Sequence, residues 1–176
     1  MDVGMAAFLG YRELSPSVFS RPQPADHQRR LAGTLRIMED LDYLLEVIKP
    51  WISKYLSHGA ESLSQVEAVG VGVWLLDAEV NNGGFDQYYF NTRGVLALKT
   101  VQALRAIGAG EAASLLEAAN KDVPILPLPD DREERIVKLE EIAESSRFAS
   151  LETEYYSGRE DRIALLAEYL RKSIDR

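Results

Sequence analysis

The chain has 176 residues, a formal net charge of −8 and no cysteine. This length suits a single domain. The lack of cysteine excludes disulfides, iron–sulfur clusters, zinc–cysteine centres and a cysteine nucleophile, and two histidines are too few for a multi-histidine metal site. The acidic balance argues against direct, nonspecific binding of nucleic acid and favours basic partners.

The sequence also predicts a cytoplasmic protein that does not enter a membrane. Residues 1–5 lack the basic start of a secretory signal, and the longest apolar stretch, residues 68–76, is about half the ~20 residues of a membrane span. No motif indicates a cofactor, a metal or a nucleophile paired with a base, so we expect none of these and no enzymatic activity.

Two parts are expected along the chain: an N-terminal extension at residues 1–25, which holds three prolines, and an all-helical domain at residues 26–176. From Asp26, a candidate helix cap, apolar residues recur at intervals of three and four as far as Ile48, which is typical of an amphipathic helix. We expect Pro50 to interrupt or kink this helix.

A second helix is predicted to begin at Ser64, because Ser64 and Glu67 form a capping-box pattern. The β-branched residues of 69–73 also fit a strand, but the capping box and the regular spacing up to Val80 favour a helix. Gly70 and Gly72 would weaken such a helix, and a close crossing with another helix would explain them.

The rest of the chain carries further helix signals. Asn81–Gly84 is a helix stop, and residues 123–129 must be extended because three prolines fall within them. Helices are expected at 85–91, at 95–107, at 111–120, from Asp130 with Glu133, and from Ser157 with Glu160. The sequence therefore predicts an all-α fold of seven to nine helices.

The segment around the helix stop holds the densest set of candidate functional residues, which we call the signature corner. Its members are one carboxylate, three amides, two glycines and an aromatic residue: Glu79, Asn82, Gly83, Gly84, Phe85, Gln87 and Asn91. The carboxylate lies near a helix C-terminus, where the helix dipole disfavours negative charge, so it should need a donor partner. Gln87 and Asn91 are four residues apart and share one helical face.

Two interpretations of the signature corner remain open. In the first, which we favour, the amides bond the backbone of the turn and act as a structural clamp while the aromatic residues fill the core. In the second, the carboxylate, the amides and the aromatics line a pocket for a small molecule or peptide.

Negative charge is concentrated in residues 37–86, which hold nine acidic and two basic residues. Helical spacing places Glu39, Asp42 and Glu46 on one face, and Glu61 and Glu67 lie further along the same block. These five residues form a candidate acidic interaction face for a basic protein surface, with a simple solubility role as the alternative.

The signature corner, followed by Gly94, resembles the signature of a bacterial family of largely uncharacterised proteins that includes the C-terminal domain of a DNA-mimic protein. Other pieces occur in the family's order, and the resemblance spans residues 40–172: 63–67, 103–109, the proline-rich stretch, 151–156 and Tyr169.

The resemblance implies an all-helical, acidic protein, with a homodimer as the expected assembly. It implies that carboxylates stand in place of DNA phosphates and occupy a basic partner, the candidate being a helix-turn-helix transcription regulator. On this expectation the protein binds no nucleic acid itself, and its biological role belongs to anionic side chains displayed outside the signature corner.

Overall fold

The computed structural model describes residues 24–174, with side chains described from Ala32 onward. Over this range the chain forms seven α-helices and one short 3-10 turn, with no strand, which confirms the all-α fold. The predicted extension at residues 1–25 falls almost wholly outside the described residues.

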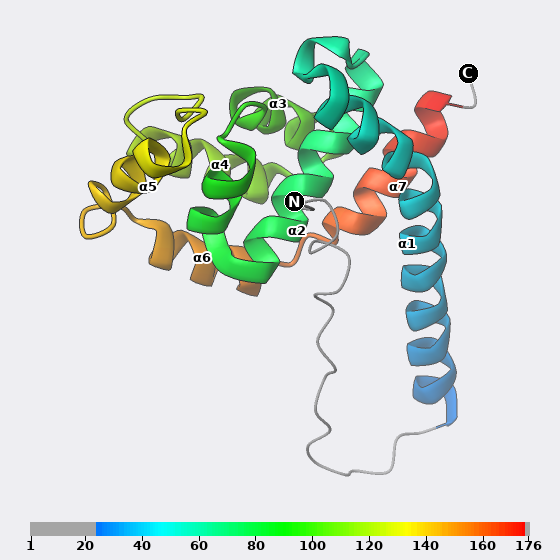
Figure 1. Cartoon of the computed structure of the whole chain (residues 1–176). Helices are drawn as coiled ribbons and strands as arrows, with labels where there is room; N and C mark the ends of the chain where they lie inside the picture. The colour runs from blue at the N-terminus through cyan, green and yellow to red at the C-terminus, as the bar shows by residue number, and fades with distance from the viewer. Residues whose placement is uncertain (1–23, 175–176) are drawn as a thin grey trace.

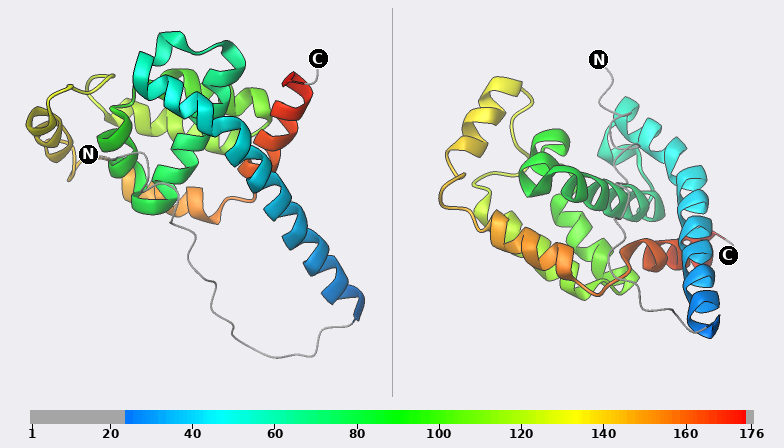
Figure 2. Two further views of the ribbon diagram at one scale, coloured as in Figure 1. Left: turned by 45° about the vertical axis from the view of Figure 1, so that its right-hand side comes forward. Right: turned by 90° about the horizontal axis from the view of Figure 1, so that it is seen from below.

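The helices pack around one central helix, α2, as Figures 1 and 2 show. Helices α1, α3, α5, α6 and α7 all contact α2, and α4 packs on α3 and α6. The bounds are α1 Pro24–His58, η2 Ala60–Ser62, α2 Gln65–Thr92, α3 Ala97–Ile107, α4 Gly110–Asp122, α5 Arg132–Glu140, α6 Phe148–Ser157 and α7 Arg162–Ile174.

Helix α2 begins with the predicted capping box, since the Ser64 side chain accepts from the Glu67 N–H and the Glu67 carboxylate accepts from the Ser64 N–H. Its first half is buried on nearly every side, which explains why residues 69–73 also resembled a strand in their apolar pattern. The two glycines mark close crossings: a Cβ on Gly70 would meet the Trp51 ring at 2.7 Å, and one on Gly72 would meet the Thr100 hydroxyl at 2.5 Å.

Helix α1 differs from its prediction at its start, and at Pro50 the structure shows no interruption. It begins at Pro24 rather than after an Asp26 cap, and it continues through Pro50 as one helix of 35 residues. The residues after Pro50 pack on the core through Trp51, Ile52 and Tyr55, and this packing stabilises the last two turns despite the proline. The N-terminal half projects from the body (Figure 2), so residues 32–39 are all exposed.

Three later predictions also need correction. Asp131, not Asp130, caps α5 by accepting from the N–H groups of Glu133 and Glu134. Helix α6 was not predicted. At α7, Asp161 accepts from the Ala164 N–H, while Glu160 turns to the start of α4 and accepts from the N–H groups of Glu111 and Ala112. The sequence placed Glu160 at the start of α7 because the two are close along the chain. An acidic side chain can cap any helix N-terminus that lies near it in space, and in the fold that N-terminus is the start of α4.

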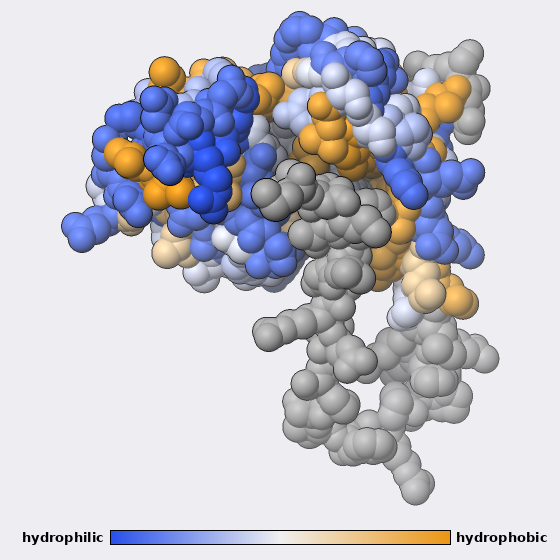
Figure 3. All heavy atoms as spheres, viewed as in Figure 1, coloured by the Kyte–Doolittle hydropathy of each residue, from blue (hydrophilic) through white to orange (hydrophobic). Residues whose placement is uncertain are grey.

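The surface is mainly hydrophilic around α5 and the C-terminal end of α1, with smaller apolar areas among the charged residues (Figure 3). Among residues 24–174, no helix has both the length and the apolar character needed to cross a membrane.

Candidate functional site: the signature corner and the acidic face

The signature corner is a sharp break within α2 (Figure 1). Gly84 has φ 79° and ψ −173°, a region that side-chain-bearing residues rarely enter, and Gly83 also leaves the helical conformation. A Cβ on Gly84 would collide with the Glu152 carboxylate, and one on Gly83 would collide with the Gln87 side chain. The predicted stop is confirmed, and a new helical segment begins directly after it.

Glu79 is the centre of the polar contacts across this break. Its side chain is nearly buried, and its Oε2 atom accepts from Gln87 Nε2 and Asn91 Nδ2, each at 2.7 Å. Charge-assisted bonds of this kind are stronger than those between neutral groups. Because Glu79 precedes the break and both amides follow it, the carboxylate fixes the angle between the two halves of α2.

Glu152 of α6 makes the second polar contact that holds the corner, and the sequence did not predict this contact. Its Oε1 atom accepts from the Phe85 N–H at 2.8 Å and thereby caps the helical segment that begins after the break. The Phe85 ring is fully buried and packs against the rings of Tyr89, Phe148 and Tyr155. Glu152 is 67 residues away along the chain, so no local pattern could have paired it with the corner.

The expected clamp is therefore built differently from its prediction. The amides of Gln87 and Asn91 bond the Glu79 carboxylate, not the backbone of Gly83 and Gly84. Asn82 is exposed, and its side chain has no hydrogen-bond partner within the described part of the chain. The backbone of the turn is instead bonded by the carboxylate of another helix.

Replacing Gln87 with alanine should lower the free energy of unfolding by about 1–3 kcal/mol, because one nearly buried oxygen of Glu79 loses a donor. Asn82→Ala is the matched control, an amide removed from the same corner with no bond to lose, and it should stay within about 0.5 kcal/mol of the parent. Urea unfolding of the three proteins measures both effects. Equal stability of the two variants would show that the Gln87–Glu79 bond contributes nothing.

The candidate acidic interaction face divides into two groups. On α1, Glu39, Asp42 and Glu46 are all exposed, and within the described residues none of them has a hydrogen bond or ion pair. Their neighbour Asp40 points the other way: it is buried, and its carboxylate accepts from Arg171 of α7 at 2.6 Å. The contrast shows that one side of α1 docks on the body while the other presents carboxylates that have no partner among the residues that the structure describes.

Glu61 and Glu67, in contrast, each form an ion pair with a lysine. Glu61 pairs with Lys99 at 3.2 Å, and Glu67 pairs with Lys54 at 2.8 Å. The hydrogen bond from Lys54, together with that from the Ser64 backbone, lowers the pKa of Glu67. The structure therefore brings Glu39, Asp42 and Glu46 together as one face and gives the other two carboxylates local cationic partners.

Basic residues bound the α1 face at both ends. Arg36 lies three residues before Glu39, and Lys49 lies three residues after Glu46, so both fall on the same helical stripe. The uninterrupted negative stretch is the seven-residue interval from Glu39 to Glu46, about 10 Å at the rise of an α-helix.

Comparison with known proteins identifies the family. The sequence pattern of the family described as DMP19-like protein matches residues 61–173, which is more than half of the chain. The chain belongs to the DMP19-like protein family. The matched residues include the whole signature corner but begin after α1, so the family match does not include Glu39, Asp42 or Glu46. No curated protein and no solved structure matches the chain.

Proposed function

We propose that this member of the DMP19-like protein family is a non-enzymatic interaction protein that binds a basic DNA-binding protein in place of DNA. A helix-turn-helix regulator is the candidate partner. The observation that carries the proposal is the set of three exposed carboxylates on α1, Glu39, Asp42 and Glu46, which have no cationic partner among the described residues. The family match and the net charge of −8 support it.

The spacing of these carboxylates supports recognition by a phosphate-binding surface. Three charges over about 10 Å of helix lie ~5 Å apart on average along the axis, compared with a spacing of ~3.4 Å between charges along a single DNA strand. A partner with two or three arginines spread over two turns of a recognition helix can therefore contact the whole face.

Exposed apolar side chains beside the face extend the proposed contact. Leu35 is 59% exposed and Met38 is 56% exposed. Leu35 lies four residues before Glu39, and Met38 lies four residues before Asp42, so each is next to a carboxylate on the helix surface. An interface needs apolar anchors as well as charge, because exposed ion pairs alone contribute little binding energy.

The test compares two triple variants as immobilised bait in extract from the native cell at 50 mM salt. Glu39→Gln, Asp42→Asn and Glu46→Gln remove the α1 face. Glu134→Gln, Glu144→Gln and Glu154→Gln remove three exposed carboxylates elsewhere and keep the total charge change equal. We expect the parent and the second variant to retain a basic DNA-binding protein and the first variant to lose it. Retention by both variants, or no retention by the parent, would contradict the proposal.

The pocket interpretation of the signature corner is the second candidate; of the corner residues, only Gln87 borders the groove that lies between α2 and α5. The donors that would meet a ligand, Gln87 Nε2 and Asn91 Nδ2, already bond Glu79. On the resemblance alone we also propose a homodimer, which would present two α1 faces to a partner that is itself a dimer.

A further inference from the structure

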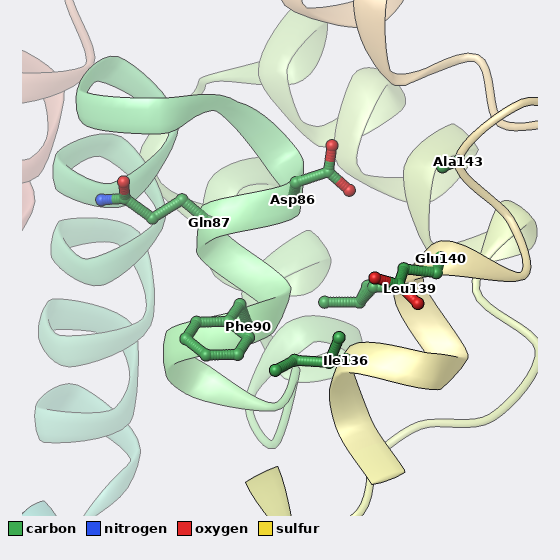
Figure 4. Close-up of a pocket in the computed structure, with 7 residues that line it drawn as sticks. All are labelled: Asp86, Gln87, Phe90, Ile136, Leu139, Glu140 and Ala143. Carbon is green, nitrogen blue, oxygen red and sulfur yellow. The ribbon is translucent and has the colours of Figure 1, made fainter. Parts of the chain in front are cut away.

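A groove of about 440 Å³ lies between the second half of α2 and α5 (Figure 4). Its floor is apolar and consists of Phe90 on α2 with Ile136, Leu139 and Ala143 on the α5 side. Its volume falls within the range of ligand pockets, which is roughly 300–1,000 Å³. Gln87 also borders it, but its amide points away from the groove toward Glu79.

One end of the groove is negative. The carboxylates of Asp86 and Glu140 point into the space between the helices (Figure 4). Neither has a hydrogen bond or ion pair within residues 24–174. Partial burial and the nearby charge of Glu152 raise the pKa of Asp86, so a positive group at this end would relieve a charge that the protein leaves unbalanced.

Positive charge lies next to the Phe90 end of the groove, just beyond the residues that line it. The guanidinium groups of Arg132 and Arg135 lie over the Phe90 ring, at 5.4 and 5.3 Å from its centre. Burial, and then the charges of Arg93 and Arg132, lower the pKa of Arg135. Arg93 is paired with Asp130, but Arg132 has no carboxylate partner in the described structure, and the buried Nε atoms of Arg93 and Arg135 have no acceptor.

The distance between the negative end of the groove and the arginines near Phe90 sets the length of a ligand that could reach both. Asp86 lies beside Glu140 and Phe90 lies beside Arg132, so the two helical segments run in opposite directions along the groove. Arg132 and Glu140 are eight residues apart on the chain, about 12 Å along a helix axis. An extended peptide spans this distance in about four residues at ~3.3 Å per residue.

We propose that this groove binds a short peptide segment of a protein partner that carries a lysine or arginine at one end, an apolar residue in the middle and a carboxylate at the other end. The cation lies between Asp86 and Glu140, the apolar side chain packs on Phe90, Ile136 and Leu139, and the carboxylate meets Arg132 and Arg135. The charge pattern of the groove fixes the direction of the segment. This site is separate from the α1 face and does not depend on it.

The test uses three capped pentapeptides of sequence Lys-Ala-Phe-Ala-Glu, Lys-Ala-Phe-Ala-Lys and Glu-Ala-Phe-Ala-Glu, titrated into the full chain labelled with ¹⁵N. The mixed-charge peptide should shift the amide signals of the groove residues Asp86, Phe90 and Ile136, and it should bind roughly threefold or more tightly than either like-charge peptide. Equal affinity of all three peptides, shifts centred elsewhere or no shifts would overturn the proposal.

Reversing the charge at the negative end of the groove gives a more stringent test. With Asp86→Lys and Glu140→Lys, the peptide with two glutamates should become the best ligand and the mixed peptide should weaken, because the groove is then positive at both ends. Glu134→Lys with Glu144→Lys is the matched control, with the same charge change on exposed carboxylates outside the groove, and it should keep the parent preference. An unchanged preference in the reversed groove would overturn the proposal. The α1 face is intact in every variant, so the two proposals fail independently.

Discussion

Gly84→Ala should lower the free energy of unfolding by about 3 kcal/mol or more. The backbone at Gly84, with φ 79° and ψ −173°, is strained by about 1–3 kcal/mol for any residue that has a Cβ. The new methyl group would also displace the Glu152 carboxylate. Loss of the bond from the Phe85 N–H would remove the cap of the following helical segment, which is worth about 1 kcal/mol.

Gly33→Ala is the control for this substitution. Gly33 is a helical, exposed residue on α1, and an added Cβ there would have no neighbour within 4 Å. The same chemical change should therefore raise stability by about 0.5–1 kcal/mol. Denaturant unfolding of both variants checks the pair, and a Gly84→Ala protein as stable as the parent would show that the corner tolerates a different geometry.

Asp77→Ala should lower the free energy of unfolding by about 3–5 kcal/mol, the range for breaking one side of a buried ion pair. Asp77 is buried, and its Oδ1 atom accepts from Arg162 Nε at 2.6 Å and from the Tyr155 hydroxyl at 3.0 Å. The Arg162 guanidinium also lies over the Tyr155 ring, 3.9 Å from its centre. Removing the carboxylate leaves a guanidinium and a phenol together in the core between α2, α6 and α7.

Glu168→Ala provides the comparison for Asp77→Ala, because Glu168 pairs with Lys172 on the exposed side of α7. Its loss should change stability by less than about 1 kcal/mol. Calorimetric or urea unfolding should therefore separate the two variants clearly. Similar losses from both would mean that the buried contact is no stronger than a solvated one.

Local chemistry accounts for the parts of the fold that sequence patterns predicted correctly. The capping box at Ser64, the stop at Gly83 and Gly84, and the close crossings at Gly70 and Gly72 each follow from what a few neighbouring residues can adopt. Glu79 needed a donor because of its place near the helix end, and the structure supplies two from the amides that the sequence had singled out.

Contacts between distant residues explain what could not be predicted. Glu152 on α6 and Glu160 in the loop after α6 each cap a helical segment that is distant along the chain, and nothing in the flanking sequence indicates which N-terminus they reach. The ion pairs that occupy Glu61 and Glu67 also depend on tertiary structure, since Lys99 and Lys54 approach only when the helices pack. The groove brings Asp86 close to Glu140, which is 54 residues further along the chain. Its negative end and the arginines near Phe90 are therefore brought together only in the folded protein.

Competition with DNA tests most directly whether the α1 carboxylates take the place of DNA on a partner. A basic DNA-binding protein retained by the parent chain is bound to a labelled DNA duplex at 50 mM salt, and the chain is then added. We predict that the parent chain releases the duplex and that the Glu39→Gln, Asp42→Asn, Glu46→Gln variant does not. A complex that holds duplex and chain together, or equal release by the variant, would contradict the claim.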